Sequence, residues 1–289
     1  MKNISRRNFL SKSAMGLGSA MLISRFPLSH GISELPKTVK IPIGFQTWIV
    51  RENLGKDFQG TLKTVAQLGY QSLEMCSPPG YKDLGFGPLM KYSAKEMKKI
   101  INDSEMIWES SHYGMDELRL SLNERIKFAQ ESGQKQMIVS SFGLPEDAKL
   151  TDWLKCADEM NKMGVVVKNA GLRLGYHNHH MEFKELEGKL IYDELMKTLD
   201  KEYVGMQFQV AVISVGYKAV DYFRKYPGRF ISAHLADWSK ETNKQVAIGQ
   251  GVVDWKEFFA NLKLAGVQNI FVEMDFSTFK DSINYLKNL

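Results

Sequence analysis

The chain has few of the residues that mark specialised architectures. It contains 2 cysteines and 8 prolines in 289 residues, which excludes a disulfide-stapled scaffold and a proline-rich disordered chain. Its 23 glycines are too few for a collagen-like repeat. With 44% hydrophobic and 25% charged residues, the composition is that of a globular protein with a full core.

The two cysteines stand in different parts of the sequence and form no C-x-x-C pair. Cys76 and Cys156 can form a disulfide only if their Cα atoms approach within about 7 Å. We expect two buried thiols, with a disulfide as the alternative in an oxidising compartment.

Acidic residues are missing from the start of the chain, where none occurs before Glu34. The same stretch carries five cations, Lys2, Arg6, Arg7, Lys12 and Arg25. Without these five, the 38 basic residues become 33 and equal the 33 acidic ones, so the formal net charge of +5 comes from this segment alone. A body of zero formal charge gives no support for a nucleic-acid partner.

Residues 1–33 have the features of a targeting segment. The hexapeptide Ser5-Arg6-Arg7-Asn8-Phe9-Leu10 resembles the twin-arginine export signal, and a weakly apolar run follows it. Between Leu10 and Ile23 this run is too short and too polar for a spanning helix, which needs about 20 mostly apolar residues. We expect export to the periplasm, with no stable membrane span unless the leader is retained as an anchor.

From residue 40 onward, short apolar runs alternate with longer stretches of helical period, which favours an α/β fold with a parallel sheet. The expected strands are Ile41–Trp48, Tyr70–Met75, Met106–His112, Gln136–Ser141, Leu172–Asn178, Val204–Val210, Arg229–Leu235 and Asn269–Met274. The glycines Gly69, Gly133, Gly171 and Gly266 stand where a helix should end, because the residue after a helix often takes the left-handed conformation.

Eight strands with about 31 residues per βα unit match the arithmetic of a TIM barrel. The rival fold is a doubly wound sheet, which carries G-x-G-x-x-G after its first strand. Here Gly44-Phe45-Gln46-Thr47-Trp48 stands at that place. The sequence therefore predicts one TIM barrel domain over residues 40–289.

Histidines and carboxylates gather at the expected strand ends, where TIM barrels place their active groups. The polar residues at these ends are His112, His177, His179, His234, Asp237, Glu273 and Asp275. His177 and His179 are two residues apart on a strand, which puts both rings on one face. Imidazoles and a carboxylate from several strands predict a site for a divalent transition metal such as Mn, Zn, Co or Fe.

Several motifs occur in an order typical of one family. They are Leu174-Gly175-Tyr176-His177-Asn178-His179, Glu182-Phe183, Tyr226-Pro227-Gly228-Arg229, His234-Leu235-Ala236-Asp237, Gly249-Gln250-Gly251-Val252-Val253-Asp254 and Val272-Glu273-Met274-Asp275. In this order the body resembles the sugar phosphate isomerase/epimerase proteins among the xylose isomerase-like TIM barrels. The resemblance covers about residues 40 to 289.

The resemblance implies a metal held by side chains from the fifth to eighth strands. The matching positions are His177, Gln209, His234 and Glu273. Relatives carry Asp where Gln209 stands, and a neutral amide offers the ion less than a carboxylate does. Val212 and Ala236 also depart from the family's pattern.

The resemblance further implies proton abstraction next to a carbonyl, with Glu273 as metal ligand and acid/base group and His177 as its partner. We expect an exported isomerase or epimerase acting on a keto-sugar or glycoside. The alternatives are a keto-glycoside lyase or hydratase, a sugar-binding protein without catalysis, and, least supported, an endonuclease of the same superfamily.

Further residues are candidates for holding a sugar. Trp48, with Trp108 or Tyr113, would stack on a ring, and the candidates for binding hydroxyl groups are His112, His179, Glu182 and Asp237. The expected partner is a small-molecule sugar or glycoside, and a homo-oligomer is possible.

Overall fold

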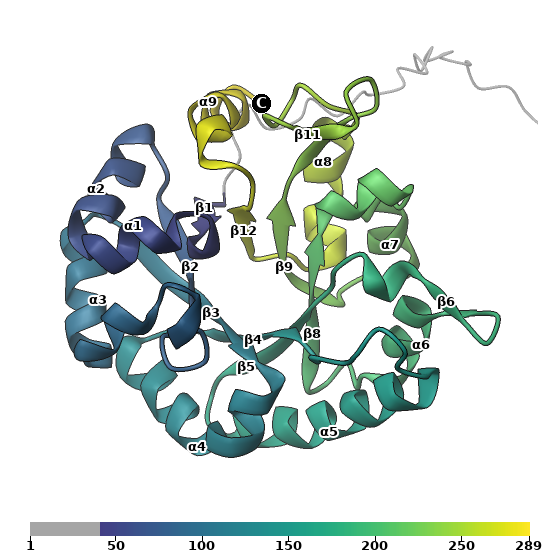
Figure 1. The fold of residues 1–289 in the computed structure, drawn as a ribbon. Coiled ribbons are helices and arrows are strands. Elements are labelled where there is room, and N and C mark those ends of the chain that lie inside the picture. The colour runs from purple at the N-terminus through teal and green to yellow at the C-terminus, as the bar shows by residue number, and fades with distance from the viewer. Residues whose placement is uncertain (1–40) are drawn as a thin grey trace, which may run out of the picture. The chain divides into compact units, whose positions relative to one another are not determined.

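The computed structural model describes residues 41–289, so the predicted export signal over residues 1–33 lies outside the described residues. Eight parallel strands close into a barrel in the order β1-β12-β9-β8-β5-β4-β3-β2, as Figure 1 shows. The barrel strands are β1 (Ile43–Gln46), β2 (Ser72–Cys76), β3 (Ile107–Gly114), β4 (Gln136–Ser141), β5 (Arg173–His177), β8 (Val204–Gln209), β9 (Phe230–Leu235) and β12 (Asn269–Val272). The predicted TIM barrel is confirmed, and the doubly wound alternative is excluded.

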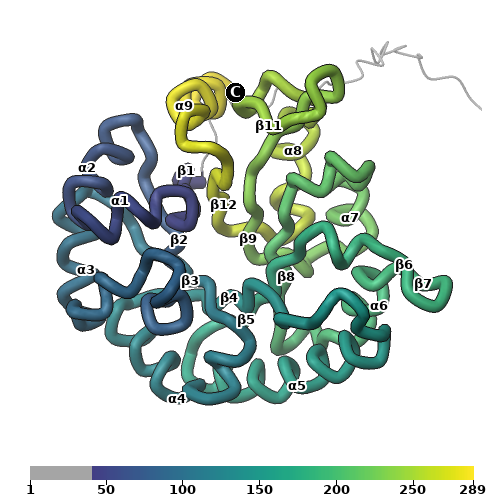
Figure 2. Tube along the Cα trace, viewed as in Figure 1, coloured from purple at the N-terminus to yellow at the C-terminus, as the bar shows by residue number. Residues whose placement is uncertain are grey.

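Helices alternate with the strands and surround the barrel in chain order (Figure 2). They are α1 (Arg51–Lys56), α2 (Phe58–Leu68), α3 (Ala94–Asp103), α4 (Met115–Ser132), α5 (Leu150–Asn169), α6 (Ile191–Thr198), α7 (Ala219–Lys225), α8 (Trp255–Ala265) and α9 (Phe279–Lys287). Two small hairpins stand apart from the barrel, β6 (Glu185–Leu186) with β7 (Lys189–Leu190), and β10 (Asp237–Ser239) with β11 (Lys244–Val246). None of the helices in residues 41–289 combines the length and the apolar character needed to cross a bilayer.

The first barrel strand ends two residues earlier than the sequence predicts. A 3₁₀ turn, η2 (Thr47–Val50), replaces the last residues of the expected strand. The side chain of Gln46 causes this, because its Oε1 atom accepts from the backbone N–H of Trp48 and caps the turn. Each of the other predicted strands begins and ends within two residues of the observed strand.

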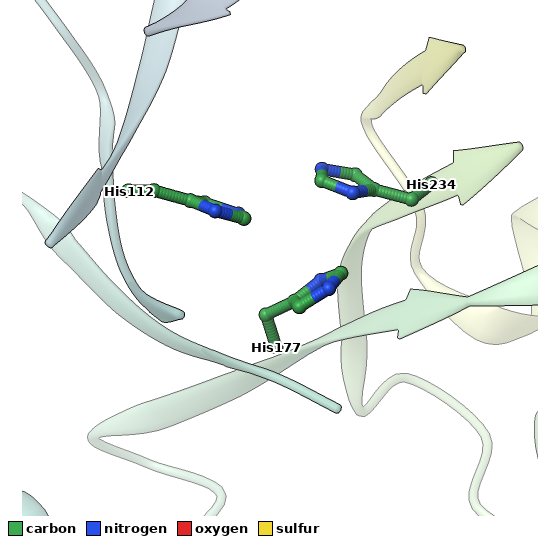
Figure 3. Close-up of side chains that lie close together, drawn as sticks. All are labelled: His112, His177 and His234. Carbon is green, nitrogen blue, oxygen red and sulfur yellow. The ribbon is translucent and has the colours of Figure 1, made fainter. Parts of the chain in front are cut away.

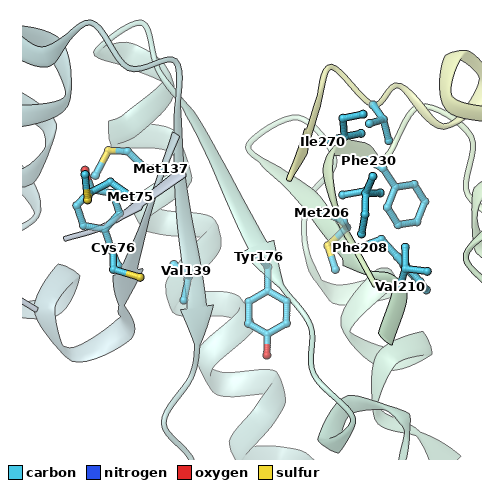
Figure 4. Packing of buried hydrophobic residues seen from close by; sticks show 14 of the residues in the cluster. Met75, Cys76, Met137, Val139, Tyr176, Met206, Phe208, Val210, Phe230 and Ile270 are labelled. Carbon is cyan, nitrogen blue, oxygen red and sulfur yellow. The ribbon is translucent and has the colours of Figure 1, made fainter. Parts of the chain in front are cut away.

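The outer face of the strands packs against the helices as an apolar layer. In β8, Met206 and Phe208 are fully buried on this face, and Figure 4 shows them with Val210, Phe230 and Tyr176 on neighbouring elements. The alternate residues of a strand point the other way. The side chains that face the barrel axis therefore decide what the interior contains.

The interior of this barrel is polar where TIM barrels commonly carry branched aliphatic side chains. Its buried side chains form a hydrogen-bonded network across the axis, which we call the polar core. Its members are Gln46, Glu74, Ser110, His112, Gln207, Ser232 and His234. Since buried polar groups need partners, the polar core links strands that are not neighbours in the sheet.

The four predicted helix-ending glycines have positive φ angles. The values are 108° at Gly69, 80° at Gly133, 80° at Gly171 and 89° at Gly266. The predicted thiols are confirmed as well, since both cysteines are buried and free.

Candidate functional site

Three histidines meet at the end of the barrel where the strands finish, which we call the mouth. His112 lies in β3, His177 ends β5 and His234 lies in β9, and Figure 3 shows their rings turned toward one another. One ring nitrogen from each lies within 4.8 Å of the others. The three side chains, here called the histidine cluster, are at most 5% exposed. The sequence prediction that these strand ends converge is confirmed.

Glu273 joins the cluster from the residue after β12, with 18% of its side chain exposed. Its Oε2 atom lies 2.9 Å from Nδ1 of His234 and 2.5 Å from Nε2 of Gln209. The Gln209 amide has its oxygen turned away, because Oε1 accepts from the N–H of Ala211. In this arrangement Gln209 holds Glu273 through its NH₂ group and directs no oxygen at the cluster.

Glu74 lies beneath the cluster, fully buried in β2, and the sequence reasoning did not single it out. Its Oε2 atom is 2.6 Å from Nε2 of His234 and 2.9 Å from Nε2 of His112. A signal was present: polar residues occupy alternate positions of strands that should be apolar on both faces, as in Ser72-Leu73-Glu74. Applied to β2, that pattern would have identified Glu74.

The charges of the site are set by its carboxylates. Burial alone would lower the pKa of His234, but the Glu273 and Glu74 carboxylates outweigh it and raise that pKa to about 9. Burial would raise the pKa of both carboxyls, yet the neighbouring histidines hold the pKa of each below its usual value. Glu273 is therefore an ionised carboxylate at neutral pH, which is the state required of a base.

His177 and His179 form the neutral side of the site. Burial lowers the pKa of both, and the neighbouring histidines lower that of His177 further. Their rings lie 4.8 Å apart between centroids. Nδ1 of each is buried and has no hydrogen-bond partner within residues 41–289. Because these two atoms lie side by side at the mouth, they are positions where a ligand could be held.

Two of the predicted hydroxyl-binding carboxylates have their oxygens occupied by the protein itself. Glu182 is 1% exposed, and its oxygens accept from the hydroxyl of Tyr176 and the N–H of His179. Asp237, also 1% exposed, accepts five N–H groups, from the backbone of Trp238, Gly249, Gly251 and Val253 and from the indole of Trp255. Both carboxylates organise loops, and neither has an oxygen free for a sugar.

The aromatic residues predicted to stack on a sugar ring differ in their exposure. Trp48 is half-buried at the mouth, with the Arg51 guanidinium 4.1 Å from its ring centroid and Tyr81 against its edge. Trp108 is 5% exposed and packs on Phe128, and Tyr113 is 1% exposed. The expectation that Trp108 or Tyr113 stacks on a ring is wrong, because both are enclosed in the apolar layer.

The side chains present fit a transition metal. Three imidazoles within reach of one point, with a carboxylate beside them, form a donor set suited to Zn, Mn, Co or Fe. The unpartnered Nδ1 of His177 is the kind of atom that such an ion would satisfy. The structure thus shows three buried histidines that could bind a metal, with His112 in a place that the sequence assigned to substrate binding.

The chain is similar to a curated protein over part of its length. Over 188 residues the chain is 23% identical to the inosose dehydratase of Clostridium perfringens, covering 58% of this chain and 63% of that protein. The chain thus spans less than two thirds of that curated relative.

Solved structures share the fold. A sugar phosphate isomerase/epimerase from Parabacteroides distasonis superposes with a TM-score of 0.73 at 23% identity, covering 89% of this chain and 96% of that one. The IolI protein, solved with a bound zinc atom, has a TM-score of 0.61 at 13% identity and covers 86% and 95%. The family profile of the xylose isomerase-like TIM barrel matches residues 62–289. The chain belongs to the xylose isomerase-like TIM barrel family.

Proposed function

We propose that the protein is a metal-assisted lyase that removes water from a polyhydroxylated substrate carrying a ketone, such as a keto-sugar or a cyclic keto-polyol. The observation that carries this proposal is Glu273, an ionised carboxylate at the mouth whose Oε2 atom is held by His234 and Gln209. The inosose dehydratase relative supports the choice of elimination.

The histidine cluster and Glu273 would hold the ion. When bound, a divalent metal there would act as a Lewis acid on the substrate's carbonyl oxygen and stabilise the negative charge that develops on it. Gln209 supplies no carboxylate, so the negative charge next to the ion comes from Glu273, with Glu74 beneath it.

Glu273 would take the proton from the carbon next to the carbonyl. The electron pair of that C–H bond forms the new carbon–carbon double bond, and the hydroxyl on the following carbon leaves. The proton on Glu273 then passes to this leaving oxygen, so that water is the product and the carboxylate is restored. One carboxylate is sufficient for both proton transfers.

Epimerisation is the second candidate, and His179 is the observation that favours it. Its neutral ring carries a buried Nδ1 without a partner, and Glu273 is among the charges that act on it. A proton removed by one of these groups and returned from the other side would invert the carbon. Both reactions begin with the same proton abstraction.

The test is incubation of metal-loaded protein with an inosose and with 3-keto-glucosides in deuterium oxide. Loss of one water from the product mass supports the lyase, while deuterium gained without a mass loss indicates epimerisation. Glu273→Gln should abolish both signals, because an amide cannot accept the proton. His180→Ala is the matched control, since His180 is exposed and, in the part of the chain that the structure describes, its ring is hydrogen-bonded to Ser214 alone.

Binding of these ketones without water loss or deuterium exchange would contradict an enzymatic role and support the sugar-binding alternative. The absence of any bound metal after purification without chelator would contradict the metal-assisted step.

We also propose export, on the basis of the twin-arginine-like hexapeptide. Replacing Arg6 and Arg7 with lysine should keep the protein in the cytoplasm of a host that has the twin-arginine pathway. Unchanged periplasmic recovery of that variant would contradict the proposal.

A further inference from the structure

We propose that Glu74 is the positioning residue of the site, which anchors Nε2 of His234, contacts Nε2 of His112 and so directs Nδ1 of His234 toward the bound ligand. The proposal rests on the proposed function for the nature of that ligand. The role of Glu74 is argued from the contacts of Glu74 and of the two histidine rings.

Glu74 is itself held firmly, by donors from several strands. Its Oε1 atom accepts from the hydroxyl of Ser110 and, at 2.8 Å, from Nε2 of Gln207. Its Oε2 atom accepts from Nε2 of Gln46 at 2.6 Å. The amide of Gln46 has a fixed orientation, because a rotation by 180° would break the hydrogen bond by which its oxygen caps the turn after β1. A carboxylate with this many fixed donors has one orientation.

Gln207 determines which nitrogen of His112 carries hydrogen. Its NH₂ group donates to Glu74 and to the hydroxyl of Ser232, so its Oε1 atom is the one that lies 2.7 Å from Nε2 of His112. An amide oxygen and a carboxylate oxygen can only accept. Nε2 of His112 lies against both, and it must therefore be the protonated nitrogen.

The same reasoning applies to His234. Its Nε2 atom is 2.6 Å from Oε2 of Glu74, and a carboxylate at that distance requires a hydrogen on the nitrogen. Nδ1 is then the nitrogen on the side of Glu273, 2.9 Å from Oε2 of that residue, to which it donates in the metal-free protein. A bound metal would take the place of this hydrogen, between a ring nitrogen and a carboxylate oxygen at the mouth.

The two rings lie side by side above Glu74, with planes 14° apart and centroids 5.1 Å apart. Nε2 of His234 is hydrogen-bonded to Oε2 of Glu74, whereas Nε2 of His112 is hydrogen-bonded to Oε1 of Gln207 and lies 2.9 Å from the same Glu74 oxygen. Phe271 contacts His234 edge to face, with centroids 6.1 Å apart. Metal-binding histidines commonly donate their second N–H to a carboxylate, and removal of that carboxylate costs 10 to 100-fold in metal affinity.

The first test uses the full-length wild-type protein with ¹⁵N-labelled histidine. NMR of the metal-free protein should show Nε2–H on His112 and His234, with slow solvent exchange and with the proton shifted downfield by the carboxylate. In protein loaded with ¹¹³Cd, the ¹⁵N coupling to the metal should appear on Nδ1 of His234. An Nε2 atom without hydrogen on either residue, or coupling through Nε2, would overturn the proposal.

The second test is Glu74→Gln, which keeps the shape of the side chain. N–H donors flank both ends of the carboxylate, so the new NH₂ group faces a donor whichever way it turns. We expect Co(II) affinity, followed by its visible absorption, to fall 10 to 100-fold and the ring N–H signals to exchange faster. His180→Ala is the control, because it removes an exposed imidazole that lies outside the polar core, and it should keep both signals.

Wild-type Co(II) affinity in Glu74→Gln, together with unchanged ring N–H signals, would rule out the positioning role. If this variant does not fold, the wild-type spectra decide the matter alone. A wild-type protein that binds no metal would defeat the metal-assisted function, whereas the location of the ring hydrogens would still decide the role of Glu74.

Discussion

Residues of one chemical type have different roles around the mouth, depending on what occupies their oxygens. Glu273 keeps one oxygen free of protein donors, while both oxygens of Asp237 accept N–H groups. A carboxylate that is saturated by backbone N–H groups cannot bind a sugar hydroxyl without losing those bonds. Asp237 therefore holds the loop that carries β10 and β11, and its effect on the site is indirect.

Asp237→Asn should destabilise the protein by about 2–4 kcal/mol, because the new NH₂ group faces N–H donors and leaves some of them buried without a partner. Urea unfolding followed by circular dichroism measures the change. Asp281→Asn, at an exposed position of α9, is the control and should change stability by less than about 0.5 kcal/mol. Equal stability of the two variants would contradict the structural role of Asp237.

At the scale of elements, two helix starts carry glutamates in opposite environments. Glu117 lies in the first turn of α4, where burial raises its pKa. Glu96 forms the capping box of α3 with Ser93, and the hydrogen bonds from Ser93 lower its pKa. Both glutamates are the third residue of their helix, so the opposite directions of their pKa shifts come from burial and from hydrogen-bond partners.

These directions predict opposite pH dependence. For Glu117 the folded protein binds the proton more tightly than the unfolded chain, so its contribution to stability is greatest at low pH and is lost as pH rises through the folded pKa. For Glu96 the contribution is present above the unfolded pKa and is lost as pH falls. As the pH rises from 4 to 7, the free energy of unfolding of Glu117→Gln should increase relative to that of the wild type. Over the same range that of Glu96→Gln should decrease relative to the wild type. Urea midpoints at a series of pH values measure both, and slopes of the same sign would contradict this account.

The barrel strands also meet closely at Gly44. A Cβ atom on Gly44 of β1 would lie 2.5 Å from Oγ of Ser72 and 2.6 Å from Cδ1 of Phe271. Gly44→Ala should therefore destabilise the protein by about 1–3 kcal/mol through overpacking. Gly114→Ala is the matched control, because a Cβ there meets nothing within 4 Å. Thermal unfolding should separate the two variants, and a neutral Gly44→Ala would show that the strands can move apart freely.

At the scale of the whole molecule, the site joins strands that are distant in the sheet. The histidine cluster connects β3, β5 and β9, and Glu74 connects β2 to β9 across the axis. A ligand bound at this point stabilises the closed barrel, because it binds the folded state and finds no such site in the unfolded chain.

Metal at 100 times its dissociation constant should add about 2.7 kcal/mol of stability, which raises the melting temperature by roughly 5–10 °C in a protein of this size. Differential scanning calorimetry with and without Mn, Zn or Co measures the shift, and chelator should reverse it. His177→Ala should reduce the shift, while His180→Ala should leave it unchanged. A melting temperature independent of every ion would contradict the metal site.

The barrel, the alternation of strands and helices, the glycine helix ends and the histidines at the mouth were all predictable from the amino-acid sequence. These depend on periodicity and on local backbone preference, which are properties of short segments. The folded barrel was needed to show that Glu74 contacts His234 and His112, that the oxygens of Asp237 and Glu182 are occupied, and that Gln209 turns its amide nitrogen toward Glu273. Those facts depend on which donors from distant strands meet each oxygen, and such contacts exist only once the barrel has closed.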